Sequence, residues 1–140
     1  MNMNLTTLLQ LAGILHAGLV WAGATMPRTV RLAEHLKPLP PFIRRLVWVY
    51  YTFIGLLLIS FGTLTFVFAR EMAAGEPVAR GLCILLAGFW TVRLVVATFV
   101  FDVRPYLTNW FYRIGYQVTN AVFVFLVLIY AWAAWKGGTR

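Results

Sequence analysis

The chain has 140 residues, of which 61% are hydrophobic and 11% charged, whereas an ordinary soluble domain has about 25% charged residues. This composition excludes a water-soluble globular domain, because too few polar side chains are present to coat its surface. The formal net charge of +8 does not indicate nucleic-acid binding, because the basic residues are spread between apolar blocks and do not gather on one soluble face.

Four apolar blocks have the length of about 20 residues that a helix needs to cross roughly 30 Å of hydrocarbon. An open strand in lipid would leave backbone groups unpaired, and the alternating segments of about ten residues that build a barrel are absent. The sequence therefore predicts an all-α integral membrane protein. It would be a four-helix bundle with short loops, forming one transmembrane domain over residues 1–140. The expected spans are residues 5–25, 46–69, 79–101 and 110–135.

The first expected span carries a histidine, His16, among alanines and glycines such as Gly13 and Ala17. Small residues at four-residue spacing let helices touch in lipid, either within one chain or across a dimer. We expect the segment to be a span and not a signal peptide. No Lys or Arg precedes it, and Met26-Pro27-Arg28 follows it in place of a small-residue cleavage site.

The loops predict an orientation. Residues 27–36 mix apolar and charged side chains, as in a short helix lying among lipid head groups, and Leu39-Pro40-Pro41 should end it. Seven basic residues lie in loops one and three, against four in loop two and the tail: Arg28, Arg31, Lys37, Arg44, Arg45, Arg104 and Arg113 on one side, Arg70, Arg80, Lys136 and Arg140 on the other. Because cytoplasmic loops carry the excess of Lys and Arg, both termini should lie outside, in the inner membrane of a bacterium.

Polar side chains within the spans indicate a candidate site, since each must be satisfied without water. His16, Arg93 and Asn120 each lie about 14–15 Å from the expected cytoplasmic end of their span, at 1.5 Å per residue. Arg113 and Gln117 precede Asn120 at three- and four-residue spacing and so share its helix face. The sequence thus predicts a cationic polar track from the cytoplasm to mid-membrane.

Two interpretations of this layer stay open. Arg93 can bond backbone carbonyls or extend toward the interface while His16 packs as a neutral ring, in which case no ligand is needed. Alternatively, the layer binds a redox amphiphile. This would be a haem b with His16 on the iron and Arg93 on a propionate, or a quinone whose carbonyls Arg93 or His16 hydrogen-bond. Trp90, three residues before Arg93, could stack on the guanidinium or on a ligand ring.

A family resemblance rests on Leu15-His16, Trp21-Ala22-Gly23, Pro27-Arg28 and Phe111-Tyr112-Arg113. This pattern resembles the bacterial oxygen-independent protoporphyrinogen oxidase and the related copper-resistance-type membrane proteins. The resemblance implies four spans and a haem-ligating histidine, which would be His16. In the third span, Trp90 and Arg93 stand where that family has a lysine and a second histidine. The other axial position would then be empty, or filled by His16 of a second copy in a homo-oligomer.

Three classes of function follow from these observations. The first is a cofactor-binding or redox membrane protein with His16, Arg93, Asn120, Trp90, Gln117 and Arg113 as candidate cofactor-binding residues. The second is a non-catalytic accessory or assembly subunit of a larger membrane complex, indicated by the scarcity of catalytic groups. The third is a small transporter that acts as an oligomer. We expect the lipid bilayer as a partner and no nucleic acid.

Overall fold

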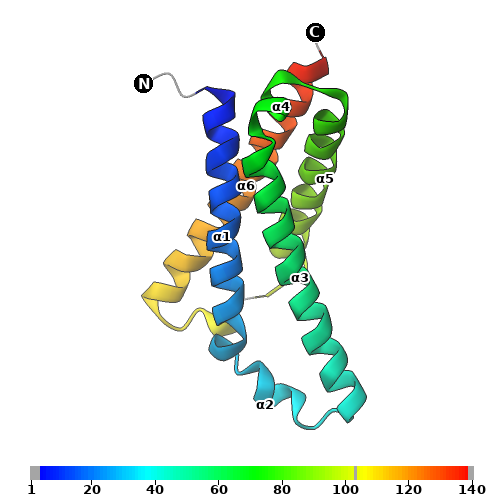
Figure 1. Ribbon diagram of the computed structural model, residues 1–140. Helices are drawn as coiled ribbons and strands as arrows, with labels where there is room; N and C mark the ends of the chain where they lie inside the picture. Colours follow the sequence, from blue (N-terminus) through cyan, green and yellow to red (C-terminus); the bar gives the residue numbers. More distant parts are fainter. Residues whose placement is uncertain (1–3, 103, 139–140) are drawn as a thin grey trace.

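The computed structural model describes residues 4–102 and 104–138 (Figure 1). This part of the chain is helical and contains no strand. Its elements are α1 (Leu5–Thr29), α2 (Leu32–Leu36), α3 (Pro41–Val67), α4 (Ala69–Ala74), α5 (Pro77–Phe99), the 3-10 turn η1 (Arg104–Tyr106) and α6 (Trp110–Gly138).

Four of these helices, α1, α3, α5 and α6, are long and apolar enough to cross a membrane. Most of their large apolar side chains face outward, as a lipid environment requires. The prediction of an all-helical protein with four candidate spans is confirmed.

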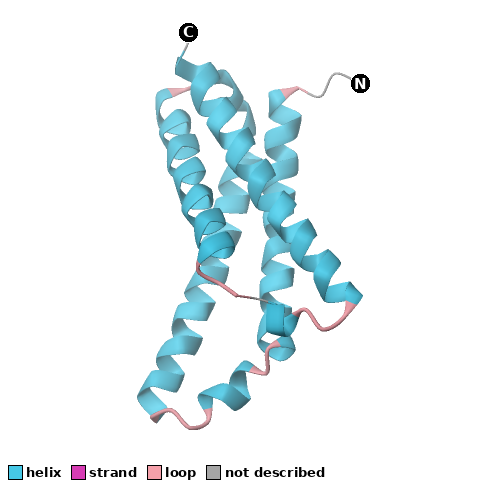
Figure 2. Cartoon of the chain, turned by 180° about the vertical axis from the view of Figure 1, so that it is seen from behind, coloured by secondary structure: helices cyan, strands magenta, loops and turns pink. Residues whose placement is uncertain are grey.

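The long helices form two closely packed pairs. α1 packs most extensively on α3, α5 packs on α6, and α1 also contacts α6. The start of α1 and the end of α6 lie at one end of the molecule, here called the terminal end. The loop containing α2 lies at the other, here called the α2 end (Figures 1 and 2).

Most of the core lies in the half of the molecule nearer the terminal end. No described residue of α3 is buried before Phe61, and none of α6 before Phe123. Figure 1 shows the reason: α3 and the first half of α6 lean away from each other toward the α2 end. The helices are therefore tightly packed at one end and spread at the other.

Helix α1 contains a proline, Pro27, and a side chain of α3 compensates for the hydrogen bond that the proline cannot make. The expected span ended near residue 25, but α1 continues through Pro27 to Thr29. Pro27 has no N–H to donate to the carbonyl of Gly23 in the preceding turn. The hydroxyl of Tyr51 on α3 donates a hydrogen bond to that same carbonyl. A side chain of the adjacent helix thus satisfies the group that the proline leaves free.

Prolines also set where two other helices begin. α3 starts at Pro41 and α5 at Pro77, first-turn positions at which a missing N–H is tolerated. Both helices therefore begin before the apolar runs at residues 46 and 79. Residues 27–36, expected as one interfacial helix, divide at Arg31, whose φ of 50° separates α1 from α2.

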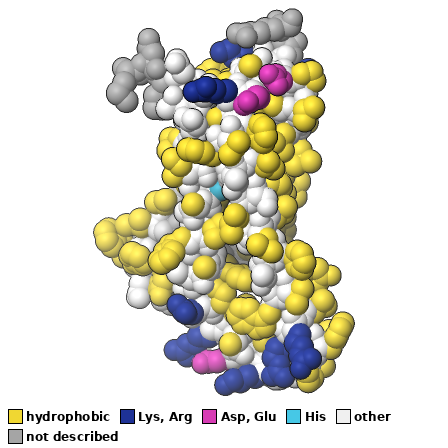
Figure 3. Space-filling model, in the orientation of Figure 1, with side chains coloured by type: hydrophobic (Ala, Val, Ile, Leu, Met, Phe, Trp, Pro, Cys, Tyr) yellow, Lys and Arg dark blue, Asp and Glu magenta, His cyan; other side chains and the backbone are white. Residues whose placement is uncertain are grey.

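The charged side chains gather at the two ends of the molecule (Figure 3). Lys and Arg side chains are concentrated at the α2 end, and a broad hydrophobic surface separates them from the charges near the termini. This division fits a protein whose middle is surrounded by hydrocarbon.

Candidate functional site

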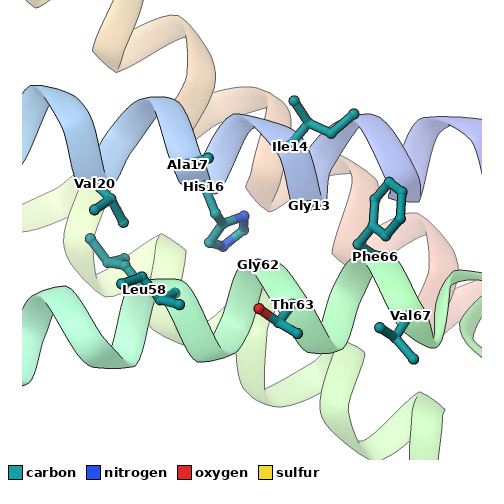
Figure 4. Close-up of a pocket in the computed structure, with 11 residues that line it drawn as sticks. Gly13, Ile14, His16, Ala17, Val20, Leu58, Gly62, Thr63, Phe66 and Val67 are labelled. Carbon is teal, nitrogen blue, oxygen red and sulfur yellow. The ribbon is translucent and has the colours of Figure 1, made fainter.

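The candidate site lies where α1 and α3 cross, and glycines make the crossing possible. A methyl group built on Gly62 would lie 2.7 Å from Cβ of His16 and 3.0 Å from the carbonyl oxygen of Gly13. One built on Gly13 would lie 2.9 Å from the carbonyl oxygen of Gly62. The two backbones therefore touch, and Figure 4 shows the imidazole of His16 lying in the space beside Gly62.

His16 is completely buried, and only one of its two ring nitrogens has a partner. Nδ1 lies 2.7 Å from the carbonyl oxygen of Ala12. Because a carbonyl only accepts hydrogen bonds, Nδ1 carries the proton in this contact. The neutral ring then has a lone pair on Nε2, which is buried and has no hydrogen-bond partner among the described residues. His16 therefore presents an unused hydrogen-bond acceptor, also suited to a metal.

Side chains from the other three long helices surround this ring. The ring centroid of Trp90 on α5 lies 5.2 Å from that of His16, and that of Tyr130 on α6 lies 6.3 Å away. The hydroxyls of Tyr130 and Thr65 on α3 share a hydrogen bond of 2.7 Å. Trp90 in turn stacks on Phe123 at 5.3 Å. All four long helices therefore meet around His16.

On the opposite side, His16 lines a groove of about 350 Å³ between α1 and α3. The remaining walls are nearly all apolar: Gly13, Ile14, Ala17, Val20, Leu58, Ile59, Gly62, Thr63, Phe66 and Val67. Figure 4 shows these lining residues, and several of them, such as Ile14, Ile59 and Val67, are exposed, so the groove opens to the outside of the helix bundle.

Thr63 is the polar side chain on the facing wall of this groove. Thr52 and Ser60, also on α3, donate hydrogen bonds to the carbonyls of Trp48 and Leu56 in their preceding turns. Within the described residues, the hydroxyl of Thr63 makes no such bond. The groove thus has an unused hydroxyl on α3 and is bordered on α1 by His16, whose buried Nε2 is also unused.

Arg93 lies outside the groove, on the far side of the aromatic cluster. Its guanidinium carbon is 5.2 Å from the ring centre of Phe123 and 5.9 Å from that of Phe101. Its Nη1 is buried and has no hydrogen-bond partner among the described residues. Ring contacts from His16 to Trp90 and from Trp90 to Phe123 connect the histidine to the arginine.

The remaining candidates lie on the leaning half of α6. Asn120 is half-buried, whereas Gln117 and Arg113 are exposed. Arg113 donates from Nε to the carbonyl oxygen of Leu107 at 3.4 Å. The hydroxyl of Tyr116 donates to the carbonyl of Ala97 at 3.4 Å. The structure therefore brings His16 and Trp90 into contact, but Gln117 and Arg113 lie on the surface.

The site offers a haem a suitable donor atom, Nε2 of His16, but not enough space for the porphyrin. An imidazole held through Nδ1 by a backbone carbonyl, with Nε2 free, is the usual form of a histidine ligand. However, Trp90, Tyr130 and the backbone of α3 at Gly62 enclose the ring. A porphyrin on Nε2, which is far wider than the single hydroxyl of a small head group, would have to displace one of them. In the described part of the chain, no cluster of three or more His, Cys, Asp or Glu side chains could hold a metal ion.

The sequence interpretation did not include Tyr130, Phe123, Gly62 or Thr63 among the candidate site residues. The aromatic residues carry no distinguishing signal, because α6 also has outward-facing aromatic residues such as Trp132. Gly62 could have been found, since a glycine within a long apolar run often marks a close helix contact in membranes.

Fold and site together define a small polytopic α-helical membrane protein with a lipid-facing groove beside a buried histidine. Comparison with known proteins found no matching protein-family model, no matching curated protein and no matching solved structure.

Proposed function

We propose that this protein binds a lipid-soluble amphiphile with a hydroxyl head group, of the quinol type, in the groove between α1 and α3. The observation that carries the proposal is the free Nε2 of His16, a buried acceptor with no partner beside a groove that opens toward lipid. A buried polar atom without a hydrogen bond costs free energy, and a ligand that supplies the bond recovers it.

The shape of the groove supports an amphiphile. Its volume of about 350 Å³ lies within the range of roughly 300–1,000 Å³ for small-molecule sites. Its walls are apolar except near His16 and Thr63, so a head group would lie against these two residues and an isoprenoid tail would extend into the hydrocarbon.

The proton on Nδ1 supports a hydrogen-bond donor as the ligand. Nε2 of the neutral ring can accept a hydrogen bond but cannot donate one. A quinone carbonyl would face this lone pair with lone pairs of its own, whereas a quinol hydroxyl would donate to it. The reduced form should therefore bind more tightly than the oxidised form.

The membrane and orientation are part of the proposal. We infer the inner membrane of a bacterium, with the α2 end in the cytoplasm, from the basic residues around α2. A quinol pool dissolved in that membrane would reach the groove from the lipid side.

The test is quinol retention in nanodiscs. The purified protein is loaded with a decyl-substituted benzoquinol, separated from free lipid, extracted and analysed by liquid chromatography. The expected result is saturable retention of the quinol, weaker retention of the matching quinone, and roughly tenfold weaker retention by His16→Phe, which corresponds to about 1.4 kcal/mol.

His35→Phe is the matched control. The ring of His35 makes the same type of contact with a backbone carbonyl, from Nδ1 to Arg31 at 3.0 Å, but it is exposed on α2. It should retain the quinol like the unmodified protein. Equal retention of quinol by the His16→Phe protein would contradict the proposal, as would equal retention of quinol and quinone.

A further inference from the structure

Arg93 is a cation whose hydrogen-bonding capacity is only partly used. A guanidinium has five N–H donors. In this protein it lies against the rings of Phe123 and Phe101, and its buried Nη1 has no partner among the described residues. Ring faces attract the charge but do not replace the hydrogen bonds lost on leaving water.

The four long helices contain no acidic residue that could neutralise Arg93. The chain has four Asp and Glu residues, and all lie outside α1, α3, α5 and α6: Glu34, Glu71, Glu76 and Asp102. A buried charge in a membrane protein is normally paired or faces a polar pathway. The fold therefore leaves room for an anion that does not belong to these helices.

The guanidinium of Arg93 points toward the α2 end of the molecule. Arg93 is six residues before the end of α5 at Phe99, about 9 Å along the helix axis. Its side chain extends toward that end, because Phe101, which lies beyond the helix, contacts the guanidinium. A long basic side chain near a helix end reaches the interface in this way.

The surface beside Arg93 suits acyl chains. The first half of α6 leans away from the other helices (Figure 1), and most of its side chains there are exposed. Phe99 and Phe101, at and just beyond the end of α5, and Trp110 and Phe111, at the start of α6, expose more than half of their area. The guanidinium of Arg93 therefore lies beside apolar, aromatic side chains such as Phe101, which contacts it and is itself exposed.

We propose that Arg93 binds the phosphate of an anionic phospholipid from the leaflet at the α2 end, with the acyl chains against the exposed aromatic residues. The planar guanidinium matches a phosphate with two parallel hydrogen bonds. This lipid site is separate from the quinol groove, which Arg93 does not line. It does not depend on the proposed quinol binding.

The experiment is native mass spectrometry of the full chain released from nanodiscs of phosphatidylcholine alone or mixed with phosphatidylglycerol. The unmodified protein should retain phosphatidylglycerol in preference to phosphatidylcholine. In R93Q, the ratio of retained phosphatidylglycerol to phosphatidylcholine should be at least tenfold lower. R93K should lose part of this preference, because lysine keeps the positive charge but lacks the planar guanidinium with its two parallel N–H donors. R45Q is the matched control, because it removes an exposed positive charge near the same end.

Three outcomes would overturn the proposal. The first is equal lipid preference in R93Q and the unmodified protein. The second is loss of the preference in D102N, which would indicate that Asp102 organises the site. The third is thermal stabilisation by inorganic phosphate in phosphatidylcholine alone, dependent on Arg93, which would indicate a free anion as the ligand.

A second measurement keeps the proposal testable if R93Q does not fold. Photoactivatable phosphatidylglycerol bound to the unmodified protein should crosslink to the peptides that contain Phe101 or Phe123. Crosslinks confined to α3 or to the loop around α2 would contradict the assignment.

Discussion

The hydrogen bond between Thr65 and Tyr130 shows how a single polar pair joins helices in an apolar core. Both residues are fully buried, and their oxygens are 2.7 Å apart. Between membrane helices such bonds contribute about 0.6 kcal/mol on average and up to about 1.7 kcal/mol, because polar groups find other partners when the helices separate.

Removing the hydroxyl of Tyr130 and removing that of Thr65 should lower the stability by different amounts. In Tyr130→Phe, Thr65 can turn its hydroxyl to a carbonyl of its own helix, so the loss should be about 0.6 kcal/mol. In Thr65→Val, the Tyr130 hydroxyl stays buried without a partner, which costs about 1–3 kcal/mol. The measurement is the free energy of unfolding in mixed detergent micelles.

Thr52→Val is the control for this pair, because the Thr52 hydroxyl bonds only the carbonyl of Trp48 on its own exposed face. It should change stability very little. If Thr65→Val were no more destabilising than Thr52→Val, the bond between α3 and α6 would not contribute as described.

At the residue scale, the sequence indicates polar outliers but not the residues that surround them. His16 stands out because a titratable ring in an apolar span needs an explanation. Tyr130 and Phe123 do not stand out, because aromatic residues occur on both the inner and outer faces of α6. Which ring faces inward depends on helix rotation, and packing against α5 sets that rotation.

At the scale of the helices, the candidate site depends on the close contact between α1 and α3. Gly62→Ala would place a methyl group 2.7 Å from Cβ of His16 and force the two helices apart. Overpacking of this kind costs about 1–3 kcal/mol. We expect a lower thermal unfolding temperature and weaker quinol retention.

Gly55→Ala is the matched substitution on the same helix. A methyl group built on Gly55 has no atom within 4 Å, so the substitution adds no clash. Alanine is also the better helix former, and the variant should be as stable as the unmodified protein or more so. Equal unfolding temperatures for the Gly55 and Gly62 variants would show that the helices do not touch at Gly62.

The helix ends illustrate what apolar length alone does not predict. The hydropathy pattern ends the first span near residue 25. It contains no information on the hydrogen bond from Tyr51 to the carbonyl of Gly23, which replaces the bond that Pro27 cannot donate. It likewise begins the second span at residue 46, although Pro41 starts the helix. Long-range hydrogen bonds and proline geometry determine where these helices end and begin. The number of apolar residues in a block gives no information on either.

Over the whole molecule, composition and block length were sufficient to predict four long apolar helices. They could not predict that α3 and α6 spread toward the α2 end, because the splay depends on where side chains interlock. The glycine contact at Gly13 and Gly62 and the ring cluster at Trp90 both lie in the half nearer the termini. The first half of α6 consequently has few neighbours, and Gln117 and Arg113 are exposed.

The distribution of charge predicts the orientation in the membrane. The start of α1 and the end of α6 lie at the same end of the molecule (Figure 1), so the loops with α2 and η1 face the opposite side. Those loops and the adjoining helix ends carry seven basic residues against four on the other side. Five of the seven are concentrated around α2: Arg28, Arg31, Lys37, Arg44 and Arg45. Basic residues in short loops are retained in the cytoplasm, so both termini should face outward.

Reporter fusions in bacterial cells test this orientation. Alkaline phosphatase, which is active only outside the cytoplasm, should be active when fused after residue 140 and inactive when fused after Lys37. A green fluorescent protein should give the reverse pattern. A fluorescent C-terminal fusion would place the α2 end outside. The Arg93 site would then take its phospholipid from the outer leaflet, whereas the quinol groove, which opens to the hydrocarbon at mid-helix, would still be reached from the lipid.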